Sequence, residues 1–385
     1  MRAQRGLRAA NGQGSVGATR GRLVLSACRV LRFLPVLLAV VSGCTVGDGS
    51  DARIRMQADM GSESVVFEGP WAARDRGEST GRMLQAVLTD RVARILQRAG
   101  VDRSSVASEL SRYGGLQAFS PGQQAELAGL AAGSAVPIEQ LALCNLLLLD
   151  REDFVPRLHA VAMAHPRSPW RGRFAAAAVS APAGLQGLWR LVLVHGSSGA
   201  PTGATSQSEG RFRDLHLRYP GCVWSIAVLN QHGTFAAWDG AGLAALWLTE
   251  LARTAPNATE LAWRIRQEWA LRGWSGGPAT VLLADRDGSF LGLRIDAHGL
   301  SERPRSADLA WLDLCGAPPS ALSDSDAAHR SLVERFDSTA AMTVDWTRRR
   351  VLLDLGPPRG TLELPATDAR SFWPWTDAPG GPGSP

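Results

Sequence analysis

The chain has 385 residues, of which 45% are hydrophobic, and this is enough for one large domain or two small ones around a substantial core. Its formal net charge is +5, but residues 1–43 carry seven arginines and no acidic residue, so the remainder has a net charge of −2. The remainder contains no basic stripe with interleaved aromatic residues, and we therefore expect no nucleic-acid partner.

The N-terminal segment is typical of a bacterial lipoprotein signal peptide. An arginine-bearing stretch precedes an apolar run that begins at Phe33 and ends in Val-Ser-Gly-Cys at Cys44. Small residues before a cysteine suit a signal peptidase, and the run of about 11 residues is too short to span a bilayer. We predict a signal peptide over 1–43, a lipid such as palmitate on Cys44, and a polar tether over 44–62. The protein would then be anchored to a bacterial membrane, facing the periplasm or the exterior. A plain secretory signal and a buried helix are the alternative interpretations.

Helical periodicity dominates residues 81–150. Apolar residues recur at helical spacing over 81–112. Ser120 can cap a second helix that has Pro121 at its first position, and another helix follows Pro137. We therefore predict that the folded domain begins with a helical region.

After residue 150 the pattern changes to strands and two further helical regions. Turns are expected at 230–233 and 285–288, each between two apolar runs, which is typical of hairpins. The helical regions are 243–271, interrupted near Pro256, and 326–336. The predicted strands are 188–194, 222–229, 234–238, 280–284, 290–295, 342–344, 350–354 and 361–364. This order predicts an α+β layered domain rather than a parallel βαβ winding.

The cysteines and histidines do not indicate a metal site. Cys144 lies in an apolar helical run and is expected in the core. No two cysteines have the CxxC spacing, and the seven histidines form neither an HxxxH nor an HExxH pattern. We predict no metal and no cofactor.

Three segments together resemble the penicillin acyltransferase family, the acyl-coenzyme A:6-aminopenicillanic acid acyltransferases. They are ELAGLAAGSAVPIEQLALCN at 126–145, Tyr-Pro-Gly at 219–221 followed by LNQHG at 229–233, and ATVLLADRDG at 279–288. The first is similar to a helix pair of that family, the second to a strand pair, and the third to a hairpin. The segments occur in the expected order, and the resemblance covers roughly 80–364.

The resemblance implies both a fold and a reaction. Members of the family are N-terminal-nucleophile (Ntn) hydrolases, so we expect an αββα four-layer, Ntn-hydrolase-like sandwich over 63–376. A disordered tail at 377–385 is expected to follow, because it is rich in glycine and proline. The reaction would be hydrolysis or acyl transfer on an amide or a thioester.

The reaction depends on two positions, and in this sequence both are occupied by unsuitable residues. The resemblance implies a cysteine made N-terminal by self-cleavage, whose thiol attacks the carbonyl, and an asparagine that helps to bind the oxyanion. Counted from the resembling segments, the nucleophile position falls near Phe174 and the oxyanion position near Asp239, and no cysteine lies between residues 145 and 221. A phenyl ring cannot attack a carbonyl, and a carboxylate repels a developing oxyanion. We therefore expect a catalytically impaired protein that acts in binding or scaffolding, with an unknown small molecule or protein as its partner.

Other features leave an active hydrolase open. Gly221-Cys222 is a glycine–cysteine pair at the start of a predicted strand, so Cys222 is the fallback nucleophile of an active cysteine Ntn amidohydrolase or acyltransferase. Ser180 and Thr202 are weaker substitutes. Residues 273–277 match the G-x-S-x-G motif of serine α/β-hydrolases. The motif passes here from a helix to a strand, which is opposite to the order that a nucleophile elbow requires.

Overall fold

The computed structural model divides the chain into two units, Met1–Val46 and Gly47–Pro385, and all described residues belong to the second. The predicted signal peptide, Cys44 and the predicted tail at 377–385 lie outside the described residues. No helix in the described part of the chain is both long enough and apolar enough to cross a bilayer. The described residues are 53–59, 62–68, 72–151, 154, 157–164, 173–180, 192–197, 212–219, 221–274, 278–302, 311–313, 324–335, 340–354 and 362–364.

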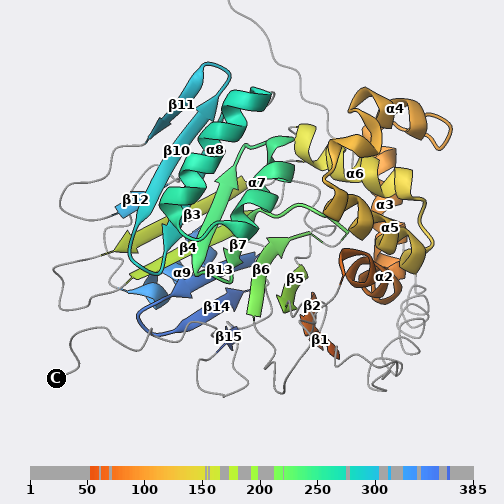
Figure 1. The fold of residues 1–385 in the computed structure, drawn as a ribbon. Coiled ribbons are helices and arrows are strands. Elements are labelled where there is room, and N and C mark those ends of the chain that lie inside the picture. Colours follow the sequence, from red (N-terminus) through yellow and green to blue (C-terminus); the bar gives the residue numbers. More distant parts are fainter. Residues whose placement is uncertain are drawn as a thin grey trace, which may run out of the picture. The chain divides into compact units, whose positions relative to one another are not determined.

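The helical region predicted at the start of the domain is present, with more breaks than expected (Figure 1). Gly100 adopts a φ of 71° and ends one helix, so the periodic stretch over 81–112 falls into several helices. The predicted cap at Ser120 is confirmed, because its side chain accepts a hydrogen bond from the Gln123 N–H while the Gln123 side chain accepts one from the Ser120 N–H. The helices are α2 (Ala73–Met83), α3 (Gln85–Ala99), α4 (Val106–Arg112), α5 (Pro121–Ser134) and α6 (Ile138–Asp150), with a 3-10 turn at Gly115–Ala118.

Helices α2 and α5 pack with their backbones in direct contact. A Cβ atom added at Gly129 of α5 would lie 2.0 Å from the carbonyl oxygen of Arg74 in α2, and one added at Gly133 would lie 2.0 Å from that of Glu78. Cβ atoms added at Gly77 and Gly81 of α2 would lie 2.2 Å and 2.5 Å from carbonyl oxygens of α5. The four glycines are spaced as Gly-x-x-x-Gly on both helices, and no larger residue fits at these positions.

The strands form two large antiparallel sheets and one hairpin. The seven-stranded sheet has the order β11-β10-β9-β8-β7-β6-β5, and the six-stranded sheet has the order β12-β3-β4-β13-β14-β15. The strands of the first are β5 (Val192–Ser197), β6 (Phe212–Arg218), β7 (Ala227–Asn230), β8 (Thr234–Asp239), β9 (Ala279–Asp285), β10 (Phe290–Asp296) and β11 (Gly299–Glu302). Those of the second are β3 (Arg157–Ala164), β4 (Arg173–Ser180), β12 (Trp311–Asp313), β13 (Ala340–Asp345), β14 (Arg350–Asp354) and β15 (Leu362–Leu364). The hairpin joins β1 (Arg53–Asp59) and β2 (Ser62–Glu68).

The two large sheets contact each other, and helices lie against both of them (Figure 1). Strand β3 of the six-stranded sheet contacts β8, β9 and β10 of the seven-stranded sheet. Helices α7 (Ala244–Thr254) and α8 (Ala258–Arg272) contact β7 to β10, whereas α9 (Ser325–Arg335) contacts β3, β4 and β13. The mixture of helices with antiparallel sheets confirms the predicted α+β class.

Strand β4 is buried on both of its faces. Ala175, Ala177 and Val179 belong to the main hydrophobic core. The alternate residues, Phe174, Ala176 and Ala178, form a smaller cluster with Ala328 and Leu332 of α9. Because side chains alternate along a strand, β4 is covered by α9 on one face and by the main core on the other.

Several predicted elements match the structure, and others were missed. The turn at 230–233, the hairpin of β9 and β10, the interruption near Pro256 and the strands β13, β14 and β15 agree with the sequence. Strands β1, β2, β3, β4, β6, β11 and β12 were not predicted. The predicted tether over 44–62 includes the residues of β1.

Candidate functional site

A carboxylate at the end of one sheet contacts the backbone at the start of a strand in the other. The Leu158 N–H, in β3, donates a hydrogen bond of 3.2 Å to Asp239 Oδ1, at the end of β8. Leu158 is buried, so this acceptor satisfies a backbone donor that would otherwise lose its partner. The expected oxyanion position therefore lies beside the first residues of β3.

The structure does not bring Phe174 and Asp239 together. In the register of β3 and β4, Leu158 lies opposite Val179, whereas Phe174 lies opposite Met163. Val179 and Phe174 are five residues apart along β4, which is about 17 Å at roughly 3.3 Å per residue. The Phe174 ring is 1% exposed and packs against α9, away from the main core. The residues beside Asp239 are instead at the start of β3, where Arg157 and Leu158 offer no nucleophilic side chain.

Cys222 is a buried thiol in a fixed turn. It is 3% exposed, and burial raises the pKa of its thiol to about 12, although Arg91 and Arg218 oppose the shift. The side chain of Asn145 holds the turn: its Nδ2 donates to the Gly221 carbonyl at 3.0 Å, and its Oδ1 accepts from the Val223 N–H at 2.9 Å. A thiol with this pKa stays protonated at neutral pH, so the turn does not activate Cys222 in the unbroken chain.

The remaining candidate nucleophiles are distributed over different places. Ser180 lies opposite Arg157 and is therefore at the same end of the sheets as Asp239. Thr202 lies outside the described residues. The G-x-S-x-G segment at 273–277 begins where α8 ends, and β9 follows it, so the helix-to-strand order is as predicted. Ser275 itself lies outside the described residues.

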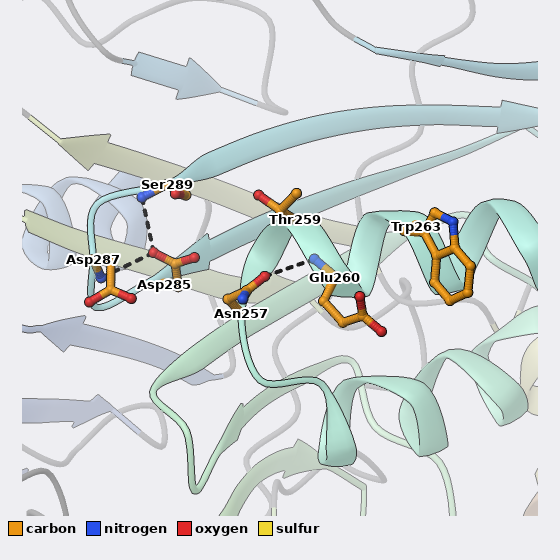
Figure 2. A pocket seen from close by; sticks show the side chains of 7 residues that line it. All are labelled: Asn257, Thr259, Glu260, Trp263, Asp285, Asp287 and Ser289. Atoms are coloured by element: carbon orange, nitrogen blue, oxygen red, sulfur yellow. Dashed lines mark hydrogen bonds between the residues drawn. The ribbon is translucent and has the colours of Figure 1, made fainter.

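A pocket of about 680 Å³ opens at the N-terminus of α8 beside the turn between β9 and β10 (Figure 2). Its lining was not predicted from the sequence; only the structure shows that Trp263 of α8 lies at this pocket with 53% of its surface exposed. The lining residues are Asn257, Thr259, Glu260, Trp263, Asp285, Asp287 and Ser289.

A buried ion-pair cluster joins the helical region to the seven-stranded sheet. Glu126 of α5 accepts from Arg76 of α2 at 2.7 Å and from Arg218 of β6 at 2.5 Å. Burial disfavours the carboxylate, but Arg218 and Arg76 outweigh burial and hold the pKa of Glu126 well below its ordinary value. Each buried charge therefore has a partner, which is the condition for its tolerance in a core.

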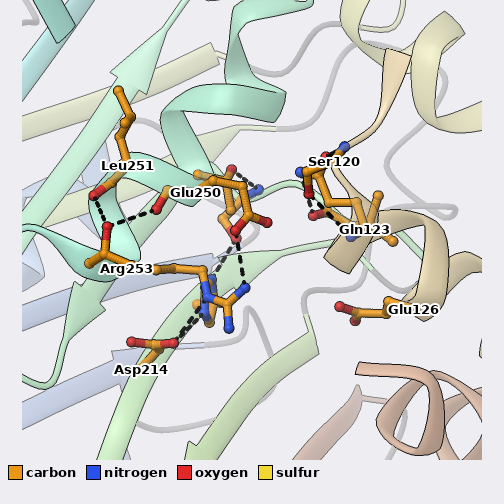
Figure 3. A network of polar contacts seen from close by, with 12 residues as sticks. Ser120, Gln123, Glu126, Asp214, Glu250, Leu251 and Arg253 are labelled. Carbon is orange, nitrogen blue, oxygen red and sulfur yellow. Dashed lines mark hydrogen bonds and ion pairs between the residues drawn. The ribbon is translucent and has the colours of Figure 1, made fainter. Parts of the chain in front are cut away.

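A second buried ion-pair cluster lies nearer the start of β6, around Asp214. Figure 3 shows Arg253 of α7 between Asp214 and Glu250, and its Nε donates to Asp214 Oδ2 at 3.1 Å. Burial lowers the pKa of His216 to about 4 against the opposing effect of Asp214, so the imidazole is neutral at pH 7. His216 Nδ1 lies 2.8 Å from the Ser225 hydroxyl. We interpret both charged groups as structural, because their charges are paired within the domain.

Among the side chains that the structure describes, no three His, Cys, Asp or Glu residues lie close enough together to hold a metal ion. Comparison of the sequence with models of known protein families and with curated proteins gives no match.

Proposed function

We propose that this protein is a lipid-anchored, non-catalytic relative of the penicillin acyltransferases that binds or scaffolds a partner in the bacterial envelope. The fold is proposed to be an αββα four-layer, Ntn-hydrolase-like sandwich. Its support is that two antiparallel sheets contact each other while α7 and α8 contact one sheet and α9 the other. The three segments that resemble the family supply the second line of support.

The hydrogen bond from Leu158 to Asp239 carries the proposal of a non-catalytic role. In an Ntn hydrolase the nucleophile and the oxyanion donor must act on one carbonyl, so the two positions must be neighbours. Here the residue at the oxyanion position is an acceptor that is already bonded to the backbone N–H of its neighbour. The strand that it contacts, β3, reads RLHAVAMA and contains no cysteine, serine or threonine. The candidate hydroxyl at this end of the sheets is Ser180 of β4, opposite Arg157.

The proposed membrane attachment rests on the sequence around Cys44. It is tested by metabolic labelling with an alkyne analogue of palmitate, followed by separation of membranes from soluble protein. The wild-type chain is expected to carry label and to sediment with membranes, whereas Cys44→Ala is expected to lose both. Cys144→Ala is the matched control, because Cys144 is buried in α6 and should leave labelling unchanged. Equal labelling of wild type and Cys44→Ala would contradict the anchor.

The non-catalytic role is tested with full-length protein purified from membranes. Chromogenic acyl amides and acyl thioesters of increasing chain length are the substrates. We expect the wild type to release no more product than Asp239→Ala or a buffer blank. Turnover that disappears in Cys222→Ala would instead support the alternative, an active cysteine Ntn amidohydrolase or acyltransferase.

A further inference from the structure

Helix α9 lies against one face of the six-stranded sheet through a small apolar cluster (Figure 1). This cluster is separate from the main hydrophobic core. Its buried residues are Phe174, Ala176, Ala178 and Ala341 of the sheet and Ala328 and Leu332 of α9. An element that is held by few buried apolar contacts can open locally at a lower free energy than global unfolding requires. We therefore expect α9 to be able to detach while the rest of the domain stays folded.

The N-terminus of α9 is held by polar contacts that mild acid leaves intact. The Ser325 hydroxyl donates to Asp345 of β13, and Arg350 of β14 donates to Asp326 at 2.5 Å. Arg348 also donates to Asp326. Burial disfavours the Asp326 carboxylate, but Arg350 and Arg348 outweigh burial and lower its pKa below the ordinary value of 3.8. The ion pairs of Asp326 therefore persist well below neutral pH.

A buried histidine lies further along α9, between the helix and the sheet. His329 is 2% exposed, and its Nδ1 lies 2.9 Å from the Thr343 hydroxyl of β13. Its Nε2 is also buried and has no hydrogen-bond partner among the described residues. Protonation makes both ring nitrogens donors, so an imidazolium here would bury a positive charge and leave one N–H without an acceptor. A protonated ring is therefore more stable when the helix is open and water surrounds the ring.

The charged groups near His329 do not compensate for this burial. Burial lowers the pKa of His329 from its ordinary value of 6.5, Asp354 and Asp326 oppose the shift, and Arg350 adds to it. Because the pKa is lower in the closed state, the open state binds more protons below pH 6.5. The closed state therefore loses stability as the pH falls below 6.5.

The strands that contact α9 also carry titratable residues. Asp345 of β13 accepts from the Ser325 hydroxyl and is already paired. In the register of β3 and β4, His159 lies opposite Ala178 of the small cluster. The β4 residues of the cluster are a phenylalanine and alanines, which carry no charge. His159 is therefore the residue that an experiment has to distinguish from His329.

We infer that α9 is an acid-released cover of the six-stranded sheet, which is closed while His329 is neutral and opens when the ring is protonated. Opening uncovers Phe174 and the alanines beside it on β4. The device uses neither Asp239 nor Cys222, on which the proposed non-catalytic role depends. Either conclusion can fail without the other.

Hydrogen–deuterium exchange of the purified full-length protein, followed by mass spectrometry, tests the inference. Exchange is measured at pH 7.5, 6.5 and 5.5, and each rate is compared with the intrinsic rate of an unstructured peptide at the same pH. One proton changes an opening equilibrium by at most about tenfold per pH unit, so we expect α9 to open about fivefold to tenfold more readily at pH 5.5 than at pH 7.5. Helix α8 contains no histidine and is the internal reference, in which no such change is expected.

Variants then assign the effect to one ring. His329→Gln cannot gain a charge in this pH range, so its ratio of opening between pH 5.5 and pH 7.5 is expected to fall to about one, whatever its basal stability. His159→Gln and His298→Gln are the matched controls and are expected to keep the ratio of the wild type; His298 is exposed in the turn between β10 and β11.

Four results would overturn the inference. The first is equal opening of α9 at all three pH values in the wild type, and the second is an equal change in α8 and α9, which would show global unfolding. The others are a ratio that His329→Gln leaves unchanged and a ratio that His159→Gln abolishes.

Discussion

The carboxylate of Asp239 accepts a hydrogen bond from the backbone N–H of Leu158 and so joins the end of β8 to the start of β3. This contact links the two large sheets at the place where the resemblance to Ntn hydrolases calls for an oxyanion donor. A side chain that already accepts a hydrogen bond there stabilises the folded backbone. The same side chain cannot donate to a developing negative charge.

Removal of the Asp239 carboxylate is expected to destabilise the domain. Asp239→Ala leaves the N–H of the buried Leu158 without its acceptor, which lowers the free energy of unfolding by about 1–3 kcal/mol. Asp239→Asn retains an acceptor oxygen, and a smaller loss is expected. Denaturant unfolding followed by circular dichroism measures both variants, and equal losses would show that the hydrogen bond to Leu158 is not the stabilising contact.

The contact between α2 and α5 predicts a difference between two glycines of the same helix. Gly129→Ala forces a Cβ against the Arg74 carbonyl and is expected to lower the free energy of unfolding by about 3 kcal/mol, as overpacked cores do. Gly122→Ala is the control, because a Cβ there meets only the Ser120 hydroxyl at 3.9 Å. That change is expected to be neutral or to stabilise α5 by up to about 1 kcal/mol. Similar losses in the two variants would contradict the close backbone packing.

The ion pairs of Glu126 predict acid sensitivity. The pKa of Glu126 is lower in the folded protein than its ordinary value of 4.5, so its stabilising contribution is present above pH 4.5 and is lost as the pH falls further. Glu126→Gln leaves Arg76 and Arg218 unpaired in the core and is expected to cost about 3–5 kcal/mol. The variant should also lose less stability than the wild type between pH 4.5 and pH 3.

A surface ion pair provides the comparison for Glu126. Glu109→Gln removes the partner of Arg112, which is 74% exposed, and a cost below about 1 kcal/mol is expected. Urea unfolding at a series of pH values measures all three proteins. A pH dependence in Glu126→Gln that matches the wild type would remove Glu126 as its source.

The burial of Cys222 predicts low reactivity. Its raised pKa, about 12, and its 3% exposure leave almost no accessible thiolate at pH 8. Iodoacetamide is expected to modify Cys222 and Cys144 only after denaturation, as measured by peptide mass spectrometry. Rapid modification of Cys222 in the native protein would mark a reactive thiol and favour the active hydrolase.

The sequence was sufficient to predict those elements that are determined by residues close together in the chain. The cap at Ser120, the turn at 230–233 and the hairpin around 285–288 each depend on residues close together in the chain, and all three are present. Strand β4 was missed because Ala175 to Ala178 have low intrinsic strand preference, and only burial between α9 and the main core makes them a strand.

The expected site was predicted incompletely for a related reason. The nucleophile position that the resemblance implies falls at Phe174 in β4, whereas the strand that contacts Asp239 is β3. Asp239 meets Leu158 only because two sheets come into contact. Glu126 likewise meets Arg218 only because α5 packs against β6. Contacts between distant segments leave no local pattern in a single sequence.

The intact mass of the full-length protein, purified from bacterial membranes and measured under denaturing conditions, distinguishes a non-catalytic protein from a self-cleaving hydrolase. We expect one polypeptide that begins at lipidated Cys44 and continues unbroken through β3 and the Gly221-Cys222 turn. Two polypeptides, with a new N-terminus at Cys222 or at the start of β3, would show self-cleavage and contradict a non-catalytic role.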